Sequence, residues 1–168
     1  RREAAQGLYN FVKACGAPVT ALHRSVDIFL KLSDPAMAVE VADEFIRRAP
    51  DNTNAHYLRG VGLQAVGDHQ RALIVVRQVP VSHPLSRQAQ FRAAVSMLNL
   101  GRITEAFSAF NQLQASAPDS APANNLGIVQ LRRPKGAAGA RAATFFAEAA
   151  ALDASDPDLW FNLGYAQW

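Results

Sequence analysis

Hydrophobic residues recur along this chain at spacings of three and four positions, which is the period of an amphipathic α-helix. Residues 54–66 and 69–79 both follow this pattern, and Gly67 and Asp68 lie between them. β-Branched residues are scattered instead of alternating with polar ones, whereas Ala, Leu, Gln and Arg, which favour helices, are plentiful. The pattern therefore predicts an all-α chain of paired helices joined by tight turns.

The pattern repeats at an interval of 34 residues. Three sets of residues keep this interval: Pro50, Pro84 and Pro118; Ala38, Ala72 and Ala106; and Ser33, Gly67 and Gly101. Three sets in one register indicate an internal repeat, in which each unit is a pair of amphipathic helices with a tight turn between them. Proline then ends each unit, because it has no N–H group and its ring clashes with the preceding turn.

Small residues inside the helices predict where neighbouring helices approach closely. A glycine within a helix costs up to about 1 kcal/mol relative to alanine, a cost that close packing can offset. The mid-helix residues of this kind are Gly60, Ala94, Gly127 and Gly164, and their counterparts on the second helices are Ala38, Ala72, Ala106 and Ala142. The larger residues Phe45, Phe110, Leu113 and Phe146 are expected to fill the space between neighbouring helix pairs.

Together these residues resemble the tetratricopeptide repeat family. The stretch "WFNLGYAQW" at 160–168 is similar to the first-helix half of the family pattern, and "GRITEAFSAFNQLQASAP" at 101–118 is similar to the second-helix half. The resemblance covers nearly the whole chain and implies a right-handed α-solenoid of stacked antiparallel helix pairs. We expect a single domain with helical hairpins at 19–52, 53–86, 87–119 and 120–156, the second helix of a partial unit at 1–18, and the first helix of another at 157–168.

The chain also departs from the family pattern. His56 and Gln90 replace the usual aromatic residue, and Arg59 stands where leucine is expected. The fourth unit carries about three extra residues within 132–143, where Pro134 ends its first helix. We expect a longer, basic loop there, and we favour a tolerated surface insertion over a functional loop.

The composition is that of a globular protein and narrows the classes of partner. Hydrophobic residues make up 49% and charged residues 18%, which excludes a disordered chain. No apolar run approaches the roughly 20 residues that cross a membrane, so we expect no membrane insertion. The net charge of +3 is too small to indicate nucleic acid as a partner. The excess of Arg over Lys and the abundant Ala suggest a bacterial chain. They do not distinguish a cytoplasmic from a periplasmic location.

No group of residues in the sequence predicts catalysis, a metal site or a cofactor site. His23 and Asp27 are spaced to share one helix face, but a metal or acid–base site needs further ligands, so a structural or surface role is favoured. Gly60 and Gly62 lack the preceding strand that a phosphate-binding glycine loop requires. Cys15 is the single cysteine, which excludes an internal disulfide. We therefore expect a non-enzymatic chain.

The family resemblance implies instead a concave groove lined by the first helices. Positions 2, 5, 6, 9, 12 and 13 of each unit usually point into that groove. Here they correspond to Tyr57, Val61 and Gln64; Gln88, Phe91, Arg92, Val95 and Leu98; Asn124, Asn125, Ile128 and Leu131; and Phe161, Asn162, Tyr165 and Trp168. This mixture of aromatic, aliphatic and amide side chains suits an extended peptide. For Val61, Val95 and Ile128, packing between adjacent first helices is an equal alternative.

Two specialised grooves of the family can be compared with these positions. Asn125 and Asn162 recur at one position, which resembles the asparagine ladder of O-linked N-acetylglucosamine transferases. The carboxylate clamp of co-chaperone repeats is not expected. Its Lys and Asn positions hold His23, Asp27, Leu58 and Gln88 here, only Arg92 fits, and Asp27 would repel a carboxylate.

The leading hypothesis is a scaffold that binds a peptide or protein segment of unknown identity in its groove. One alternative is the substrate-selecting or regulatory arm of a larger enzyme. Another is self-association, in which the acidic, aromatic C-terminal helix docks on the arginine-rich segment 54–104 of a second copy. The aromatic face of 157–168 lacks the polar cap of a terminal repeat. Either the chain belongs to a longer array of repeats, or another molecule covers this aromatic face. We favour the longer array.

Overall fold

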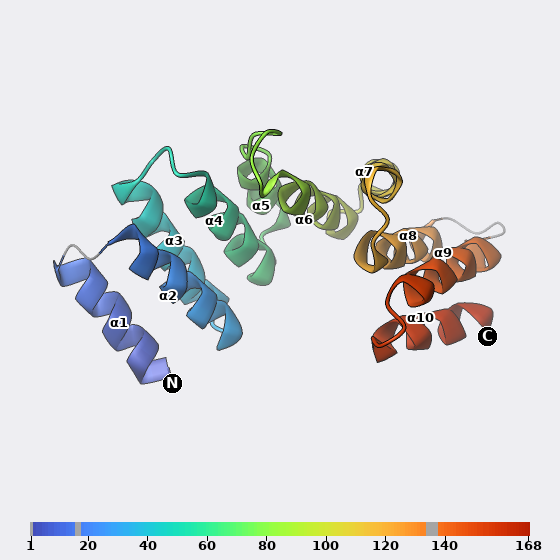
Figure 1. Cartoon of the computed structure of the whole chain (residues 1–168), viewed down its shortest axis with the longest axis horizontal. Helices are drawn as coiled ribbons and strands as arrows, with labels where there is room; N and C mark the ends of the chain where they lie inside the picture. The colour runs from blue at the N-terminus through green and yellow to red at the C-terminus, as the bar shows by residue number, and fades with distance from the viewer. Residues whose placement is uncertain (1, 16–17, 134–137) are drawn as a thin grey trace. The chain divides into compact units, whose positions relative to one another are not determined.

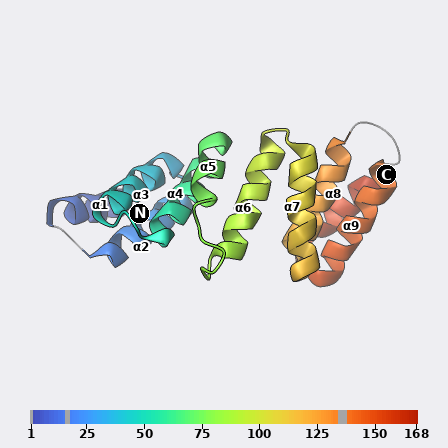
Figure 2. The same cartoon turned by 90° about the horizontal axis from the view of Figure 1, so that it is seen from above.

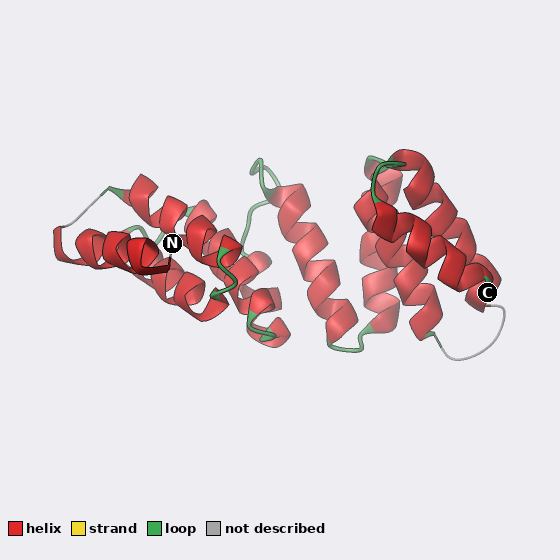
Figure 3. Ribbon diagram, turned by 90° about the horizontal axis from the view of Figure 1, so that it is seen from below, coloured by secondary structure: helices red, strands yellow, loops and turns green. Residues whose placement is uncertain are grey.

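The computed structural model describes residues 2–15, 18–133 and 138–168, and the regular elements within these ranges are all α-helices (Figure 3). They are α1 (Arg2–Cys15), α2 (Val19–Lys31), α3 (Pro35–Arg48), α4 (Thr53–Ala65), α5 (His69–Val76), α6 (Ser86–Asn99), α7 (Ile103–Ser116), α8 (Ser120–Arg132), α9 (Ala138–Leu152) and α10 (Pro157–Gln167). The prediction of an all-α chain is confirmed. None of these helices is both long and apolar enough to span a membrane.

The tight turns between paired helices lie where the sequence predicts them. Gly67 and Gly101 have φ angles of 86° and 74°, and Ser33 at the equivalent position has a φ of 56°. Glycine adopts this left-handed region without steric cost, which explains its recurrence at the turn. The next helix then begins on a capping side chain in two of the three cases, because Asp34 and Asp68 accept hydrogen bonds from the backbone N–H groups of Met37 and Arg71.

Helix α5 is shorter than the predicted 69–79 and ends at Val76. The proline that sets this end is Pro80, four residues before the repeating Pro84. In a continued helix the carbonyl of Val76 would accept from the N–H group four residues later, and Pro80 has none. Residues 77–85 form turns instead, in which His83 Nδ1 accepts a hydrogen bond from the Leu85 N–H at 3.1 Å.

The chain divides into two compact units, Arg1–Ser96 and Met97–Trp168. In the first unit α2, α3 and α4 lie side by side, with α1 against α2 and α5 against α4 (Figure 1). In the second unit α8 packs against α7 and α9 (Figure 2), and α10 packs against α9 (Figure 1). The division into repeat units given above stays a prediction.

Each unit has its own apolar core. In the first, residues of α1 to α4 including Leu22, Val26, Phe29 and Phe45 form one buried cluster. In the second, Phe110, Leu126 and Phe146 are among the fully or almost fully buried side chains. Ala38, Ala72, Ala106 and Ala142 are all completely buried, as their predicted role in close packing requires.

Two of the mid-helix glycines lie where another helix leaves no room for a side chain. A Cβ atom on Gly127 would lie 2.5 Å from the Phe146 ring, and one on Gly60 would overlap the Val76 side chain. Phe146 therefore covers a glycine of its own helix pair as well as filling the core. Gly164 differs from the prediction, because nothing lies within 4 Å of a Cβ atom built there. Pro134 and residues 135–137 of the predicted inserted loop fall outside the described residues, and residues 138–143 belong to α9.

Candidate functional site

In the first unit, the predicted groove residues of α4 remain partly accessible. Tyr57, Val61 and Gln64 are each half-buried. Gln64 has a structural role, because its Nε2 donates to the Arg92 carbonyl at 2.5 Å and to Ser96 Oγ at 2.7 Å. These two bonds join α4 to α6, so the first helices of adjacent pairs lie next to each other here.

Helix α6 contributes the other predicted residues of this unit. Gln88 is exposed, and Phe91, Arg92 and Val95 are half-buried. None of these side chains is buried, and Gln64 of α4 bonds to α6 at Arg92 and Ser96. We call the set Tyr57, Val61, Gln88, Phe91, Arg92 and Val95 the α4–α6 surface.

A pocket of about 380 Å³ opens further toward the N-terminus of the same unit. Its lining includes Thr20, His23 and Arg24 of α2 and Asn54 of α4. The Nδ1 atom of His23 lies 3.7 Å from Oδ2 of Asp27. Arg24 makes no ion pair with the residues that the structure describes. We did not predict these lining residues, although Thr20, His23 and Arg24 occupy positions 2, 5 and 6 of the first predicted unit. Applying the family rule to that unit would have found them.

In the second unit, the predicted amide residues of the groove form hydrogen bonds within the chain. Asn162 of α10 donates from Nδ2 to Asn124 Oδ1 of α8 at 2.9 Å. Asn125 donates to the Ala121 carbonyl of its own helix, also at 2.9 Å. The side-chain amides of Asn125 and Asn162, whose recurrence resembles an asparagine ladder, therefore each donate to a group within the chain.

The remaining predicted residues of the second unit differ in exposure. Ile128 is half-buried, whereas Leu131, Phe161 and Tyr165 are exposed. The prediction that Leu98 lines the groove is corrected, because this residue is only 4% exposed and its side chain is unavailable to a peptide. The Arg132 guanidinium of α8 donates to the Leu98 carbonyl at 3.2 Å, which joins α8 to the end of α6.

Within residues 2–15, 18–133 and 138–168, no group of three or more His, Cys, Asp and Glu side chains could hold a metal ion. The groups that remain accessible include the Gln88 amide, the Arg92 and Arg24 guanidinium groups and the partly accessible rings of Tyr57 and Phe91.

Several solved structures are similar to this chain. MamA from Desulfovibrio magneticus RS-1 is 21% identical with a TM-score of 0.71, and the match covers 89% of this chain and 83% of that one. TTC0263, a TPR protein of Thermus thermophilus, is 18% identical with a TM-score of 0.77 over 98% of this chain and 89% of its own. YrrB, described as a TPR protein with an unusual peptide-binding site, is 16% identical with a TM-score of 0.72 over 99% and 84%. At these identities the likeness establishes the fold, an α-solenoid.

Sequence comparison identifies the family. No curated protein sequence matches this chain. Two models of the tetratricopeptide repeat match residues 24–80 and 88–120, which together are more than half of its length. Paired helices with small residues at the crossing points, left-handed turns between them and these two matches lead to one conclusion: the chain belongs to the tetratricopeptide repeat family.

Proposed function

We propose that this chain is a non-enzymatic interaction scaffold that binds an extended peptide segment of a partner protein on its α4–α6 surface. The observation that carries the proposal is the half-buried state of its aromatic and aliphatic residues. Tyr57 and Phe91 present ring surface to solvent, although the same helices bury Leu58 and Ala94 in the core. Aromatic side chains of this kind supply most of the binding energy in many interfaces.

The polar residues of the surface complement the rings. Gln88 and Arg92 lie on the same helix as Phe91, and they offer donors to backbone carbonyls or to acidic side chains of a bound segment. The pocket lined by His23, Arg24 and Asn54 lies in the same unit and extends the set of polar contacts. The peptide-binding site named in the description of YrrB, which has the same fold, is a further support.

The experiment selects peptides from a displayed random library with the wild-type chain and titrates them by fluorescence anisotropy. We expect Tyr57→Ala combined with Phe91→Ala to weaken binding of the selected peptides more than about tenfold, the effect of losing aromatic anchors. Ile74→Ala is the matched control, because Ile74 is an exposed apolar residue of α5 outside this surface. Its affinity should equal that of the wild type.

Tyr57 also packs against the core of the first unit, so each variant is checked by circular dichroism for helix content. Arg92→Ala provides a second, milder variant that removes a polar contact without removing an aromatic ring. If the selected peptides bind all these variants as tightly as the wild type, or if no peptide is enriched, the proposal is wrong.

A further inference from the structure

Acidic and basic side chains of the first unit differ in how they are paired. Each acidic residue of α3 interacts with a side chain of the same unit: Glu40 with Tyr9, Asp43 with Arg59, and Glu44 with Arg47 and Arg48. The first helices α4 and α6 contain no acidic residue. Arg24 of α2 and Arg92 of α6 make no ion pair with the residues that the structure describes. These two guanidinium groups therefore favour an acidic ligand.

The 380 Å³ pocket of this unit, which we call the α2–α4 pocket, brings Arg24 together with further polar groups. Its walls include Thr20, His23 and Arg24 of α2, Phe45 of α3, and Asn52 and Asn54 of α4. The Thr20 hydroxyl and the Asn54 amide can donate hydrogen bonds, and none of the described lining residues is acidic. Helices α2 and α4 both begin at this pocket, and the partial positive charge of helix starts adds to that of Arg24.

The nearest acidic residue of α2, Asp27, leaves this arrangement available. Its Oδ2 atom lies 3.7 Å from Nδ1 of His23, and Asp27 is not among the described residues that line the pocket. Asp27 would repel an acidic residue placed further along α2. An acidic group of a bound segment is therefore expected in the pocket, next to Arg24.

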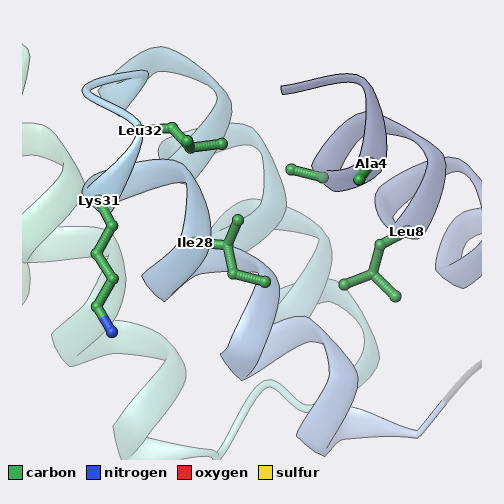
Figure 4. A pocket seen from close by; sticks show the side chains of 6 residues that line it. Ala4, Leu8, Ile28, Lys31 and Leu32 are labelled. Carbon is green, nitrogen blue, oxygen red and sulfur yellow. The ribbon is translucent and has the colours of Figure 1, made fainter. Parts of the chain in front are cut away.

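A second pocket of the first unit has a different character. It has a volume of about 460 Å³ and lies between α1 and α2, where its described walls are Ala4, Ala5, Leu8, Ile28, Lys31 and Leu32 (Figure 4). Apolar side chains make up most of these walls, and Lys31 is the one charged residue among them. The combination of a cation with hydroxyl and amide donors is thus a property of the α2–α4 pocket.

The α2–α4 pocket adjoins the α4–α6 surface along α4. Asn54 of the pocket and Tyr57 of the surface are three residues apart on this helix. Side chains at this spacing are neighbours on one helix face, with Cβ atoms about 5–6 Å apart. Because an extended segment rises about 3.3 Å per residue, its residue in the pocket would lie about two or three positions from its residue on Tyr57.

We propose that a segment bound on the α4–α6 surface places an Asp or Glu side chain in the α2–α4 pocket, where the carboxylate binds the Arg24 guanidinium. Thr20 and Asn54 supply further donors to its oxygens, and Phe45 supplies an apolar wall for its methylene groups. The inference rests on the proposed function and specifies the chemistry of the partner: an acidic residue two or three positions from an apolar or aromatic one. Hydrogen bonds between two charged groups are stronger than neutral ones, so this contact selects segments by charge.

Peptide selection with a charge-reversed chain tests this inference. The wild type should enrich Asp or Glu at one position of the displayed library, two or three residues from an apolar or aromatic residue. Arg24→Glu should enrich Lys or Arg at that position instead, because the pocket then carries a carboxylate. Arg77→Glu makes the same change of charge at an exposed residue just after α5, outside the pocket and the α4–α6 surface. This matched control should keep the preference of the wild type.

Fluorescence anisotropy with one selected peptide gives a second, quantitative measurement. Replacing its acidic residue by the corresponding amide should weaken binding to the wild type about tenfold, the effect of losing a hydrogen bond between charged groups. The same replacement should change the affinity for Arg24→Ala by less than about twofold, because the partner of the carboxylate is already absent. Arg24 is exposed, so these substitutions leave the core of the unit intact.

The outcomes separate this inference from the proposed function. Enriched peptides without an acidic position, or an acidic preference that persists in Arg24→Glu, overturn the inference and leave the α4–α6 surface as the peptide site. An equal loss of the preference in Arg77→Glu also overturns it, because the effect would then come from net charge. If no peptide is enriched, or if binding does not depend on Tyr57 and Phe91, the proposed function is wrong and this inference is wrong with it.

Discussion

At the scale of single residues, glycine has two different roles in the helices of this protein. Gly127 has no side chain because the Phe146 ring occupies the space, whereas Gly164 has open space around it. The sequence places both in the same "NLG" motif, at 125–127 and 162–164, and gives no sign of this difference. Only the neighbouring helix decides whether the glycine is required for packing.

This difference predicts opposite effects of one substitution. Gly127→Ala should destabilise the chain by about 1–2 kcal/mol, because the clash with a buried ring exceeds the gain of up to about 1 kcal/mol in helix propensity. Gly164→Ala should raise the free energy of unfolding by up to about 1 kcal/mol, because only the propensity term applies. Urea unfolding of dilute protein, followed by circular dichroism, compares the two. Equal effects of the two substitutions would contradict the packing role of Gly127.

At the scale of the elements, α1 is attached to its unit by a buried phenol. The Tyr9 hydroxyl donates to Glu40 Oε1 of α3 at 3.0 Å, and Tyr9 is 3% exposed. Burial and the hydrogen bond to Glu40 raise the pKa of Tyr9 from 10.0 to about 12. The neutral phenol is thus the form that holds α1 against α3.

The raised pKa of Tyr9 predicts a loss of stability at high pH. Below pH 10 the phenol is neutral in the folded and the unfolded chain, so its contribution is complete. Between pH 10 and about 12 the unfolded chain loses the proton first, and the free energy of unfolding falls by up to about 1.4 kcal/mol per pH unit. Tyr9→Phe should have a shallower slope in urea unfolding over this range. A slope identical to that of the wild type would show that Tyr9 is not the group responsible.

The ends of the helices are set by residues nearby in the sequence. At α5 the observed end differs from the predicted one. Asp34, Asn52, Asp68, Asp119 and Asp156 each cap the helix that follows, so the starts of five helices could be predicted from Asp or Asn. The end of α5 was predicted wrongly, because the 34-residue interval places a helix-ending proline at 84, whereas Pro80 already ends the helix. A repeat pattern predicts shared features well and local exceptions poorly.

At the scale of the whole molecule, stability resides in contacts between helices that are close in sequence. Helices of the first unit pack within that unit, and the pairs α8–α9 and α9–α10 do the same in the second. In an architecture of this kind each repeat is stabilised chiefly by its neighbours. Damage to one core should therefore remain local.

Two buried phenylalanines provide a test of this locality. Phe146→Ala removes a side chain that is 1% exposed and should cost about 3–5 kcal/mol, with faster amide hydrogen exchange in α8 to α10. Phe29→Ala, at a site that is 0% exposed in the first unit, should instead accelerate exchange in α1 to α4. Exchange that rises equally in both units for either variant would indicate a single cooperative structure.

The candidate surfaces show where prediction from sequence stops. Family positions correctly directed attention to α4 and α6, but they could not tell that Gln64 is bonded to α6 or that Leu98 is buried. The amides of Asn124 and Asn162 likewise find each other across two helices. Whether a polar side chain binds a partner or its own chain depends on which group lies within hydrogen-bonding distance, and the sequence alone does not contain that distance.

The all-α architecture, the turn positions and the resemblance to the repeat family can be predicted from the amino-acid order, because helix period, left-handed glycines and capping residues act over a few neighbouring positions. Which equivalent residues are covered depends on how the helices pack in the folded molecule. Trp160 and Gly164 of α10 and Leu8 and Phe11 of α1 carry the same pattern as residues that other helices bury. Burial of an apolar face requires a second surface in contact with it, and that contact is a property of three-dimensional packing.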